Sequence, residues 1–435
     1  MKLTVFVLSK PVATLESIGD FKSVLTYEAG ADPNHLVSLT MPVRTESWVW
    51  DDPLHPIFRM NLPEGYLLHV LEEQFGRHIG ASPITLLSIV GRNMIGRLQV
   101  AVPGADLNEP VTPLDVAELL KGDNSEAAFS ALVRKYATSG VSGVVPKFLD
   151  VQKGSRFSQY GKATLFTRRH IVKGSSQHLP FVALNEHLGM QVAAKIVPTA
   201  RTEVSQDGQA LVVHRFDVDG DGQPKYGLED FCALLGMRPS AKYETTWERI
   251  GKAVRDNVPG AKQRETFHHL AATILLTYAL RNADCHAKNI ALTYTSRADV
   301  QIAPVYDMLT TCVYAEHKDS PPGISFMGKK TWQPGKNLEK FLAGNFGIPP
   351  REQAALVEKI GDAISDTAPR VRRAMKEHPG FREIGKHLLN AWREGVSDLR
   401  NKRTYALGDW KSGEAFLGFS DPPPLKAPRR IIGKS

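Results

Sequence analysis

The sequence has no run of about 18 or more consecutive apolar residues, the length that a membrane-spanning helix needs. Its longest apolar stretch lies near 271–280, and the apolar segment at the N-terminus ends at Lys10, too early for a secretory signal. The three cysteines, Cys232, Cys285 and Cys312, are too few for a disulfide framework, and their spacings match no zinc motif. These absences predict a cytoplasmic protein with no membrane partner.

The composition is that of an ordinary globular protein, with a local excess of positive charge. A chain of 435 residues exceeds what one hydrophobic core usually organises, so we expect two or three packed units. With 42% hydrophobic and 23% charged residues, the chain is far from a disordered composition. The net charge of +8 is concentrated in 367–403 and in the tail 421–435. This local charge favours contact with a polyanion, although a solvated helix face would also account for it.

Hydrophobic periodicity predicts a mixed first half and a mainly helical second half. Strands are expected at 3–8, 98–102, 164–167, 171–173 and 210–216, and again at 290–292. Helices are expected at 66–75, 114–120, 127–136, 185–195, 266–281, 351–364 and 381–399. Beyond Leu228 strands are otherwise expected to be scarce. The pattern therefore predicts an α+β fold.

A dense block of polar residues, from Asn282 to Asn289, follows the buried helix predicted at 266–281. Such side chains are costly to place beside a core unless they are used or satisfy one another. A hydrogen-bonded loop capped by Asp284 is one explanation. However, Asn289 follows Asp284 by five residues, and Asp307 comes later at the end of another apolar segment. Protein kinases place a catalytic Asp, a magnesium-binding Asn and a second acid in this order.

Each of these residue types suits one task in phosphoryl transfer. The Asp284 carboxylate can orient and deprotonate an attacking hydroxyl. Asn289 and Asp307 offer the hard oxygen ligands that Mg²⁺ prefers when it also holds nucleotide phosphates. Lys288 can offset charge on the migrating phosphoryl group.

A kinase site also needs three upstream parts, and candidates stand in the required order. The Ser- and Gly-containing loop 139–147 could cover the phosphates, although ordinary turn chemistry explains it as well. Lys173, on a predicted strand, could reach the α- and β-phosphates, or it could face solvent. Glu186, on the next predicted helix, could pair with that lysine. The order of all these parts is more specific than any one of them.

At these positions the sequence resembles the HipA-type serine/threonine protein kinases of bacterial type II toxin–antitoxin modules. The segments that carry the resemblance are Ser142–Lys147, His170–Lys173, Asn185–Glu186, His214–Asp217, Glu229–Cys232, Lys242–Glu244, Asp284–Asn289 and Tyr306–Asp307, with 61–65 and 86–92 in the N-terminal part. The resemblance implies a bilobal, protein-kinase-like fold. It would comprise an extra N-terminal subdomain (1–105), a mixed α/β N-lobe with phosphate loop and hinge (106–230), and a mainly α-helical C-lobe with the catalytic loop (231–435).

The resemblance also implies an ATP- and Mg²⁺-dependent toxin that phosphorylates a translation-related protein such as an aminoacyl-tRNA synthetase. Asp284 would accept the proton with Lys288 beside it, Asn289 and Asp307 would hold magnesium, and His214–Phe216 would form the adenine hinge. The implied ATP-binding residues are Ser142, Gly143, Val144, Val145, Pro146, Lys147, Lys173, Glu186, His214, Arg215, Phe216, His286, Lys288, Asn289, Tyr306 and Asp307. The implied partners are a HipB-type helix-turn-helix antitoxin and operator DNA.

Members of this family phosphorylate a serine of their own phosphate loop, which ejects the loop and disables ATP binding. The physical reason is that a phosphate adds roughly −1.5 to −2 charge beside those of ATP. Here the position used by the best-known members falls on Gly140, which has no hydroxyl, so Ser142 is the candidate autophosphorylation site and Ser139 a weaker one.

Two alternatives and two decoy motifs accompany this hypothesis. The chain could be a DNA-associated interaction protein with a vestigial kinase site, or a small-molecule kinase on the same scaffold. Asp217–Gly222 resembles the start of a calcium loop, but Leu228 stands where a bidentate Glu is needed, so we expect a hairpin turn. Gly91–Arg97 has the spacing of a phosphate-binding Walker loop but ends in Arg97 instead of Lys.

Overall fold

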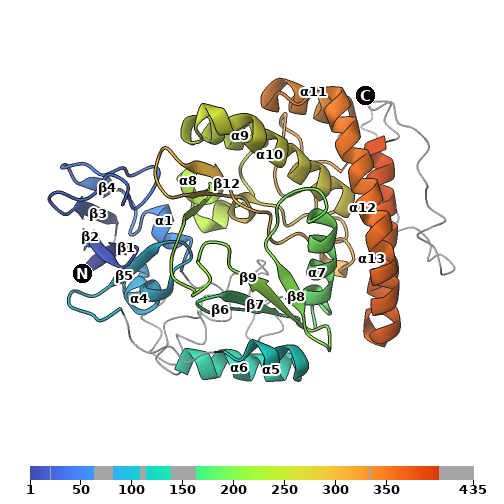
Figure 1. Cartoon of the computed structure of the whole chain (residues 1–435), viewed down its shortest axis with the longest axis horizontal. Helices are drawn as coiled ribbons and strands as arrows, with labels where there is room; N and C mark the ends of the chain where they lie inside the picture. Colours follow the sequence, from blue (N-terminus) through green and yellow to red (C-terminus); the bar gives the residue numbers. More distant parts are fainter. Residues whose placement is uncertain (20, 63–81, 108–113, 139–162, 333–334, 401–435) are drawn as a thin grey trace.

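The computed structural model describes residues 1–19, 21–62, 82–107, 114–138, 163–332 and 335–400. Three parts pack together: an N-terminal sheet, a second sheet with helices on both faces, and a helical body that adjoins both sheets (Figure 1). The helix predicted at 66–75, the loop 139–147 and the basic tail 421–435 lie outside the described residues. None of the helices in the described part is both long and apolar enough to cross a membrane.

The N-terminal subdomain is an antiparallel five-stranded sheet of order β4-β3-β2-β1-β5. Its strands are β1 (Lys2–Val7), β2 (Lys10–Ile18), β3 (Lys22–Tyr27), β4 (Trp48–Trp50) and β5 (Leu98–Ala101). Leu3, Val5 and Val7 alternate into a core that α1 (Pro56–Arg59) and α4 (Pro83–Val90) help to cover. The predicted β1 and β5 are confirmed, whereas β2 and β3 were not predicted.

The N-lobe sheet is also antiparallel, with the order β6-β7-β9-β8. Its strands are β6 (Ala163–Phe166), β7 (His170–Gly174), β9 (Ala210–His214) and β8 (Thr202–Val204). Alternate residues of β9 reach opposite faces: Val212 packs with α5 (Val116–Lys121) and α6 (Glu126–Thr138), and Val213 joins the core that contains α7 (Val182–Ala193). The predicted strands and helices of this region are confirmed, within a few residues at their ends.

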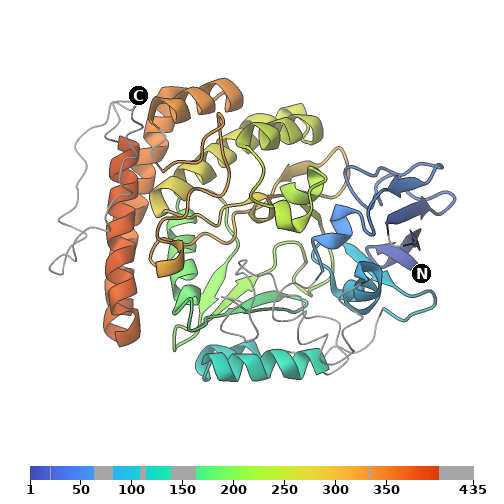
Figure 2. The same ribbon diagram turned by 180° about the vertical axis from the view of Figure 1, so that it is seen from behind.

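The helical body surrounds α10 (Gly260–Leu280), which is buried on all sides over most of its length. Around it lie α8 (Phe231–Leu234), α9 (Trp247–Asn257), α11 (Gly335–Phe346), α12 (Pro350–Glu377) and α13 (Arg382–Arg400). Seen from behind, α12 and α13 run side by side at the end of the molecule opposite the N-terminal sheet (Figure 2).

One prediction for this half was wrong. Strands are scarce as expected: the strand predicted at 290–292 is confirmed as β11 (Ala291–Tyr294), and it forms a small antiparallel sheet with the short strands β10 (Gly227–Asp230) and β12 (Val300–Ile302), which were not predicted. Helix α12 does not end near Ile364 but continues through Pro369 to Glu377, because Val371 and Met375 keep the apolar face buried. This burial offsets the hydrogen bond that proline removes from a helix.

Helix α7 is held firmly against the helical body. The side-chain amide of Asn185 donates to Thr310 O at 2.8 Å and accepts from Thr310 N at 3.0 Å. At its C-terminal end, Arg370 of α12 donates to Gln191 at 2.7 Å, and Lys195, just beyond the helix, pairs with Asp366 at 2.8 Å. The helix is therefore attached both to the segment after Asp307 and to α12.

A buried polar network joins the N-terminal subdomain to the small sheet, and we call it the Arg97–Glu229 junction. Arg97 is 1% exposed and donates to the backbone oxygens of Asn34, Leu36 and Thr295. Glu229 has no exposed surface and accepts from Ser38 Oγ, Leu39 N and Tyr294 Oη at 2.8, 2.6 and 2.7 Å. Burial raises the pKa of Glu229. The Walker-like spacing at Gly91–Arg97 therefore ends in a structural arginine.

Candidate active site

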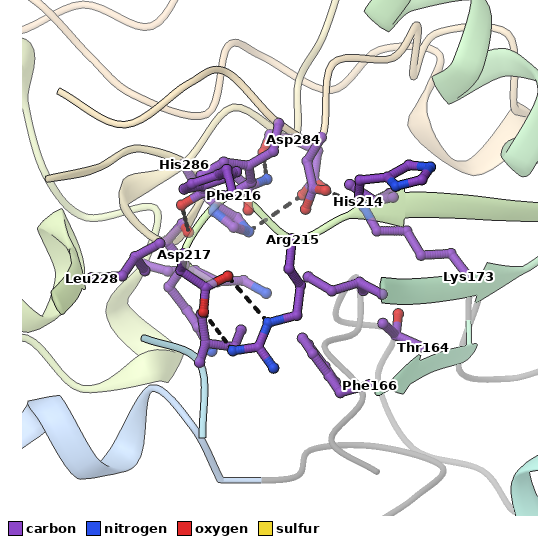
Figure 3. A pocket seen from close by; sticks show the side chains of 18 residues that line it. Thr164, Phe166, Lys173, His214, Arg215, Phe216, Asp217, Leu228, Asp284 and His286 are labelled. Carbon is purple, nitrogen blue, oxygen red and sulfur yellow. Dashed lines mark hydrogen bonds and ion pairs between the residues drawn. The ribbon is translucent and has the colours of Figure 1, made fainter. Parts of the chain in front are cut away.

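The N-lobe sheet and the helical body enclose a cleft, the central cleft, with about 880 Å³ of space that is partly open to solvent (Figure 3). Its lining residues are Ile95, Thr164, Phe166, Ile171, Lys173, Val213, His214, Arg215, Phe216, Asp217, Leu228, Lys242, Asp284, His286, Lys288, Asn289, Tyr306 and Asp307. The cleft therefore gathers residues from the N-terminal subdomain, from β6, β7, β9 and the segment after β9, from β10, and from three loops of the helical body.

Lys173 pairs with two carboxylates at the inner end of the central cleft. Because Val172 faces α5 and α6, the alternation of β7 turns Lys173 toward α7, where its Nζ donates to Glu186 Oε1 at 2.5 Å. The same Nζ pairs with Asp307. Lys173 is 6% and Glu186 is 1% exposed, and charges this deep persist only when they are paired. The ion pair expected between Lys173 and Glu186 is thus present, with Asp307 as a third member.

The backbone of Asp307 adopts the left-handed conformation, with φ of +58°. Few residues other than glycine do so, and Asp is among those that tolerate it best. Asn282 Nδ2 donates to Asp307 O at 3.2 Å, and the neighbouring Tyr306 Oη donates to Lys288 O at 3.0 Å. These bonds fix the direction in which the Asp307 carboxylate leaves the chain.

The loop 282–289 begins where α10 ends, at Arg281, whose left-handed φ of +55° turns the chain. Asp284 N donates to Asn282 Oδ1 at 3.1 Å, and Asn289 Nδ2 donates to Asp284 O at 2.8 Å. Asp284 does not cap the short 3₁₀ helix at 287–289, whose N-cap residue is His286. Capping is therefore not the reason for this aspartate, whose side chain lines the central cleft.

The Asp284 carboxylate is flanked by two aromatic side chains. Tyr243 Oη donates to Asp284 Oδ1 at 2.7 Å, and His286 Nε2 lies 3.6 Å from the same oxygen. Burial, together with Lys242 and Lys288, lowers the pKa of His286 well below its usual value. The imidazole is therefore neutral at physiological pH, and it brings no positive charge to Asp284.

Asn289 and Asp307 both line the central cleft and offer an amide and a carboxylate oxygen. Within the described ranges, no three His, Cys, Asp or Glu side chains gather to hold a metal ion by themselves. Protein sites for Mg²⁺ often supply only one or two carboxylates and leave the other positions to phosphate oxygens and water. The donor set therefore fits Mg²⁺ that arrives together with a nucleotide.

The residues expected at the hinge line the central cleft, but the side chains of His214 and Arg215 pair with carboxylates outside the hinge. His214 Nε2 lies 2.7 Å from Glu203 Oε1, and Arg215 forms a double contact with Asp217 (Figure 3). Asp217 also accepts from Gly96 N at 2.7 Å, which ties this segment to the N-terminal subdomain. The segment after it is a turn, as predicted, in which Gly222 N donates to Asp219 O.

Sequence reasoning missed part of the cleft lining. Asp217 and Lys242 belong to the segments that carry the family resemblance, but they had been given no role. The apolar wall was missed as well, and its residues are Ile95, Phe166, Ile171, Val213 and Leu228, with Thr164 beside them. Mostly apolar walls with a few polar groups are typical of small-molecule sites. The expected phosphate-loop residues, Ser142 to Lys147, lie outside the described residues.

A four-stranded antiparallel sheet with a lysine–glutamate pair, above a helical lobe that presents Asp284, Asn289 and Asp307, defines a kinase-like fold. The sequence matches the family description "HipA N-terminal domain" over residues 3–101 and "HipA-like C-terminal domain" over residues 139–368. The chain therefore belongs to the HipA-like family.

Comparison with individual proteins agrees with this assignment. "Putative kinase Y4dM" of Sinorhizobium fredii is 26% identical over 73% of this chain and 79% of its own length. "Putative kinase Y4mE" of the same organism is 27% identical over 69% of this chain and 74% of its own. The structure of HipA from Shewanella oneidensis MR-1, solved with HipB and operator DNA, superposes with a TM-score of 0.63, 17% identity and coverage of 93% and 98%. That likeness shows the same fold.

Proposed function

We propose that this chain is an ATP- and Mg²⁺-dependent kinase that phosphorylates serine or threonine in a protein and acts as the toxin of a toxin–antitoxin module. The observation that carries the proposal is the meeting of Lys173, Asp284, Asn289 and Asp307 on one cleft of about 880 Å³, although they come from three separate segments of the chain. Mutual satisfaction within a core would explain each side chain alone, but not their convergence on open space.

In this proposal Asp284 accepts the proton of the acceptor hydroxyl. Hydrogen bonds with Tyr243 and Asn282 hold Asp284 in place. Lys173 contacts the ATP phosphates and Lys288 offsets charge on the transferred group. Asn289 and Asp307 hold Mg²⁺. The apolar wall and the hinge 214–216 receive the adenine. Lys173 pairs with Asp307 in the structure. When nucleotide and Mg²⁺ bind, Lys173 would also contact the phosphates and Asp307 would also contact the metal.

We propose the same partners that the family resemblance implies. A HipB-type helix-turn-helix antitoxin would neutralise the chain and bring it to operator DNA, as the neighbour from Shewanella oneidensis was solved with both. Arg370 and Arg373, which are exposed on α12, are candidates for contact with DNA phosphates. The target would be a translation-related protein, Ser142 the autophosphorylation site, and 1–105, 106–230 and 231–435 the three structural units.

The kinase function is tested with γ-³²P-labelled ATP and Mg²⁺. Label should enter a candidate protein substrate, and Asp284→Asn should abolish this transfer while leaving the protein folded by circular dichroism. Label transfer that survives Asp284→Asn would assign the reaction to a different site. A complete absence of transfer with retained operator binding would favour the DNA-associated alternative with a vestigial site.

Contact with DNA has its own test. The complex of antitoxin and chain should bind operator DNA more tightly than antitoxin alone. This advantage should shrink as salt rises, because the release of counterions from DNA is less favourable in concentrated salt. Changing Arg370 and Arg373 together to alanine should lower the slope with salt. Equal affinity with and without the chain would remove this part of the proposal.

A further inference from the structure

A second cavity borders Asp284 and shares no other described residue with the central cleft. It encloses about 690 Å³, partly open to solvent, and its lining includes Tyr243, Thr311, His317, Pro322 and Lys330. The carboxylate assigned to proton transfer therefore stands between two separate spaces. One space holds the groups suited to a nucleotide, and the other has no role in the function described so far.

The walls of the second cavity are firmly built. Thr311 Oγ1 accepts from Ala283 N at 2.9 Å and donates to Arg281 O at 3.0 Å, which fastens one wall to the loop of Asp284. The opposite segment packs so closely that a Cβ on Gly323 would overlap Cys285 O. Pro321 and Pro322 restrict the backbone just before it. Such a cavity is present before any ligand arrives.

The reaction requires space at this position. In phosphoryl transfer the acceptor oxygen attacks the γ-phosphorus opposite the leaving oxygen, so the acceptor approaches from the side away from ADP. The acceptor hydroxyl must also come within hydrogen-bond distance of the base that removes its proton. A cavity that touches the nucleotide cleft only through Asp284 places an acceptor beside this base and outside the space assigned to the nucleotide.

Charged and polar groups of this cavity favour an acidic ligand. Lys330 Nζ donates to Tyr243 O at 2.6 Å, which uses one of its three protons. Burial lowers the pKa of Lys330, and the nearby Glu244 opposes that change. Among the described residues, His317 Nε2 is buried without a hydrogen-bond partner. Lys330 is the one lysine or arginine in the described lining, so a carboxylate from outside would pair with it in competition with the nearby Glu244.

We propose that this cavity is the acceptor site, and that it binds a peptide segment in which an acidic side chain lies near the serine or threonine to be phosphorylated. The acidic side chain pairs with Lys330 while the hydroxyl reaches Asp284. The hydroxyl oxygen forms a bond to the γ-phosphorus, the bond to the β,γ-bridging oxygen breaks, ADP leaves, and the hydroxyl proton passes to Asp284. This site rests on the kinase function proposed above.

The first test uses the full chain, ATP, Mg²⁺ and a serine peptide library in which each flanking position is fixed in turn as Asp, Ala or Lys. The protein should prefer Asp at one flanking position. Lys330→Glu should change the ratio of Asp to Lys preference at that position by at least about tenfold, since the charge of the reader is reversed. Lys329→Ala, which alters the exposed neighbouring lysine, is the matched control and should keep the original preference.

The second test does not depend on catalysis. Binding of the Asp-fixed and the Ala-fixed peptides of the library, each with a fluorescent label, is followed by anisotropy without ATP in the unaltered chain and in Lys330→Glu. Peptide binding that Lys330→Glu removes supports the site even if no phosphate is transferred, and that combination would reject the kinase function alone. Active protein whose preference is unchanged by Lys330→Glu overturns the acceptor site alone. Loss of both binding and transfer in the unaltered chain overturns both.

Discussion

The central cleft and the Arg97–Glu229 junction both bury charge, but they satisfy it in different ways. At the junction Arg97 donates to three backbone oxygens, and Glu229 accepts from a backbone amide and two hydroxyls. In the central cleft Lys173 is held by Glu186 and Asp307, which are themselves charged and movable side chains. Backbone partners cannot leave, whereas a cation or an anion can exchange one ionic partner for another.

The comparison gives a physical criterion for a binding site. Burial alone would select Arg97, Glu229, Lys173 and Asp284 equally. What separates the cleft is that its charges border open space and have partners that a ligand could replace. The junction, in contrast, fills its space and serves as a joint between the N-terminal subdomain and the body. Four substitutions can break or sharpen this distinction.

The largest effect is expected for Lys173→Met. In the proposed function Lys173 contacts the nucleotide phosphates. Its loss should therefore lower kcat/KM about 10³- to 10⁴-fold, equivalent to roughly 4–5.5 kcal/mol of transition-state stabilisation. Steady-state assays with labelled ATP measure the loss, and urea unfolding measures stability in the same variant. The change also leaves the buried Glu186 without this cation, so stability is expected to fall too. Folded Lys173→Met protein with unchanged kcat/KM would contradict the distinction between the two regions.

Arg97→Met should act in the opposite way, through stability. Three backbone oxygens lose their donor and the buried Glu229 loses a neighbouring positive charge. The free energy of unfolding should therefore fall by roughly 3–5 kcal/mol. Urea unfolding gives this value, and nucleotide affinity of the folded protein should stay the same. A control is Arg44→Met, at an exposed arginine of the same subdomain. A weakened affinity for nucleotide would show that the junction takes part in the site.

Asn185→Ala tests how firmly the Glu186 helix is held. The change leaves Thr310 N and O without their partner in a buried position, so the free energy of unfolding should fall by about 2–3 kcal/mol. Hydrogen exchange of α7 amides should speed up as well. Gln191→Ala, at a half-buried position of the same helix, removes only the bond from Arg370 and should lower stability less. Equal effects of the two substitutions would contradict the anchoring role of Asn185.

The smallest effect is a pH dependence that originates in the N-terminal subdomain. Burial lowers the pKa of His55 to about 3, so the folded protein keeps this ring neutral while the unfolded chain protonates it below about pH 6.5. Its contribution to stability is therefore complete above pH 6.5 and is lost as pH falls, by roughly 2 kcal/mol at pH 5. His55→Asn keeps a helix-capping acceptor and should flatten the decline in urea midpoint between pH 7 and pH 5. An unchanged slope would reject the assignment.

Much of the candidate site could be predicted because its main residues are close in sequence or follow a fixed order. Asp284 and Asn289 share one loop, and Lys173 and Glu186 lie on consecutive elements. Lys242 and the second cavity could not be predicted, because 317–330 has no periodicity and its place beside Asp284 depends on the close packing of Gly323. The pairing of Arg215 with Asp217 also depends on a local turn that residue types alone do not specify.

The fold was predicted where alternation or helical periodicity is regular, and missed where it is interrupted. Strand β2 contains Pro11, which argues against a strand, and its pairing with β1 shifts register between Val5 and Phe6. Helix α12 contains Pro369, which normally ends a helix. In both cases burial of apolar side chains outweighs the local preference, and this balance is visible only once the neighbouring elements are placed.

The two-sided attachment of α7 has a consequence for control. In a kinase whose corresponding helix can move outward, the glutamate and the lysine separate and the enzyme adopts an inactive conformation. Here Asn185, Lys195 and Gln191 each form a hydrogen bond or ion pair with a neighbouring segment. Outward movement of α7 would therefore require several of these bonds to break together. We expect the catalytic machinery to be ready as soon as the chain folds, and restraint to come from sequestration, from blocked access for ATP, or from how much protein the cell makes.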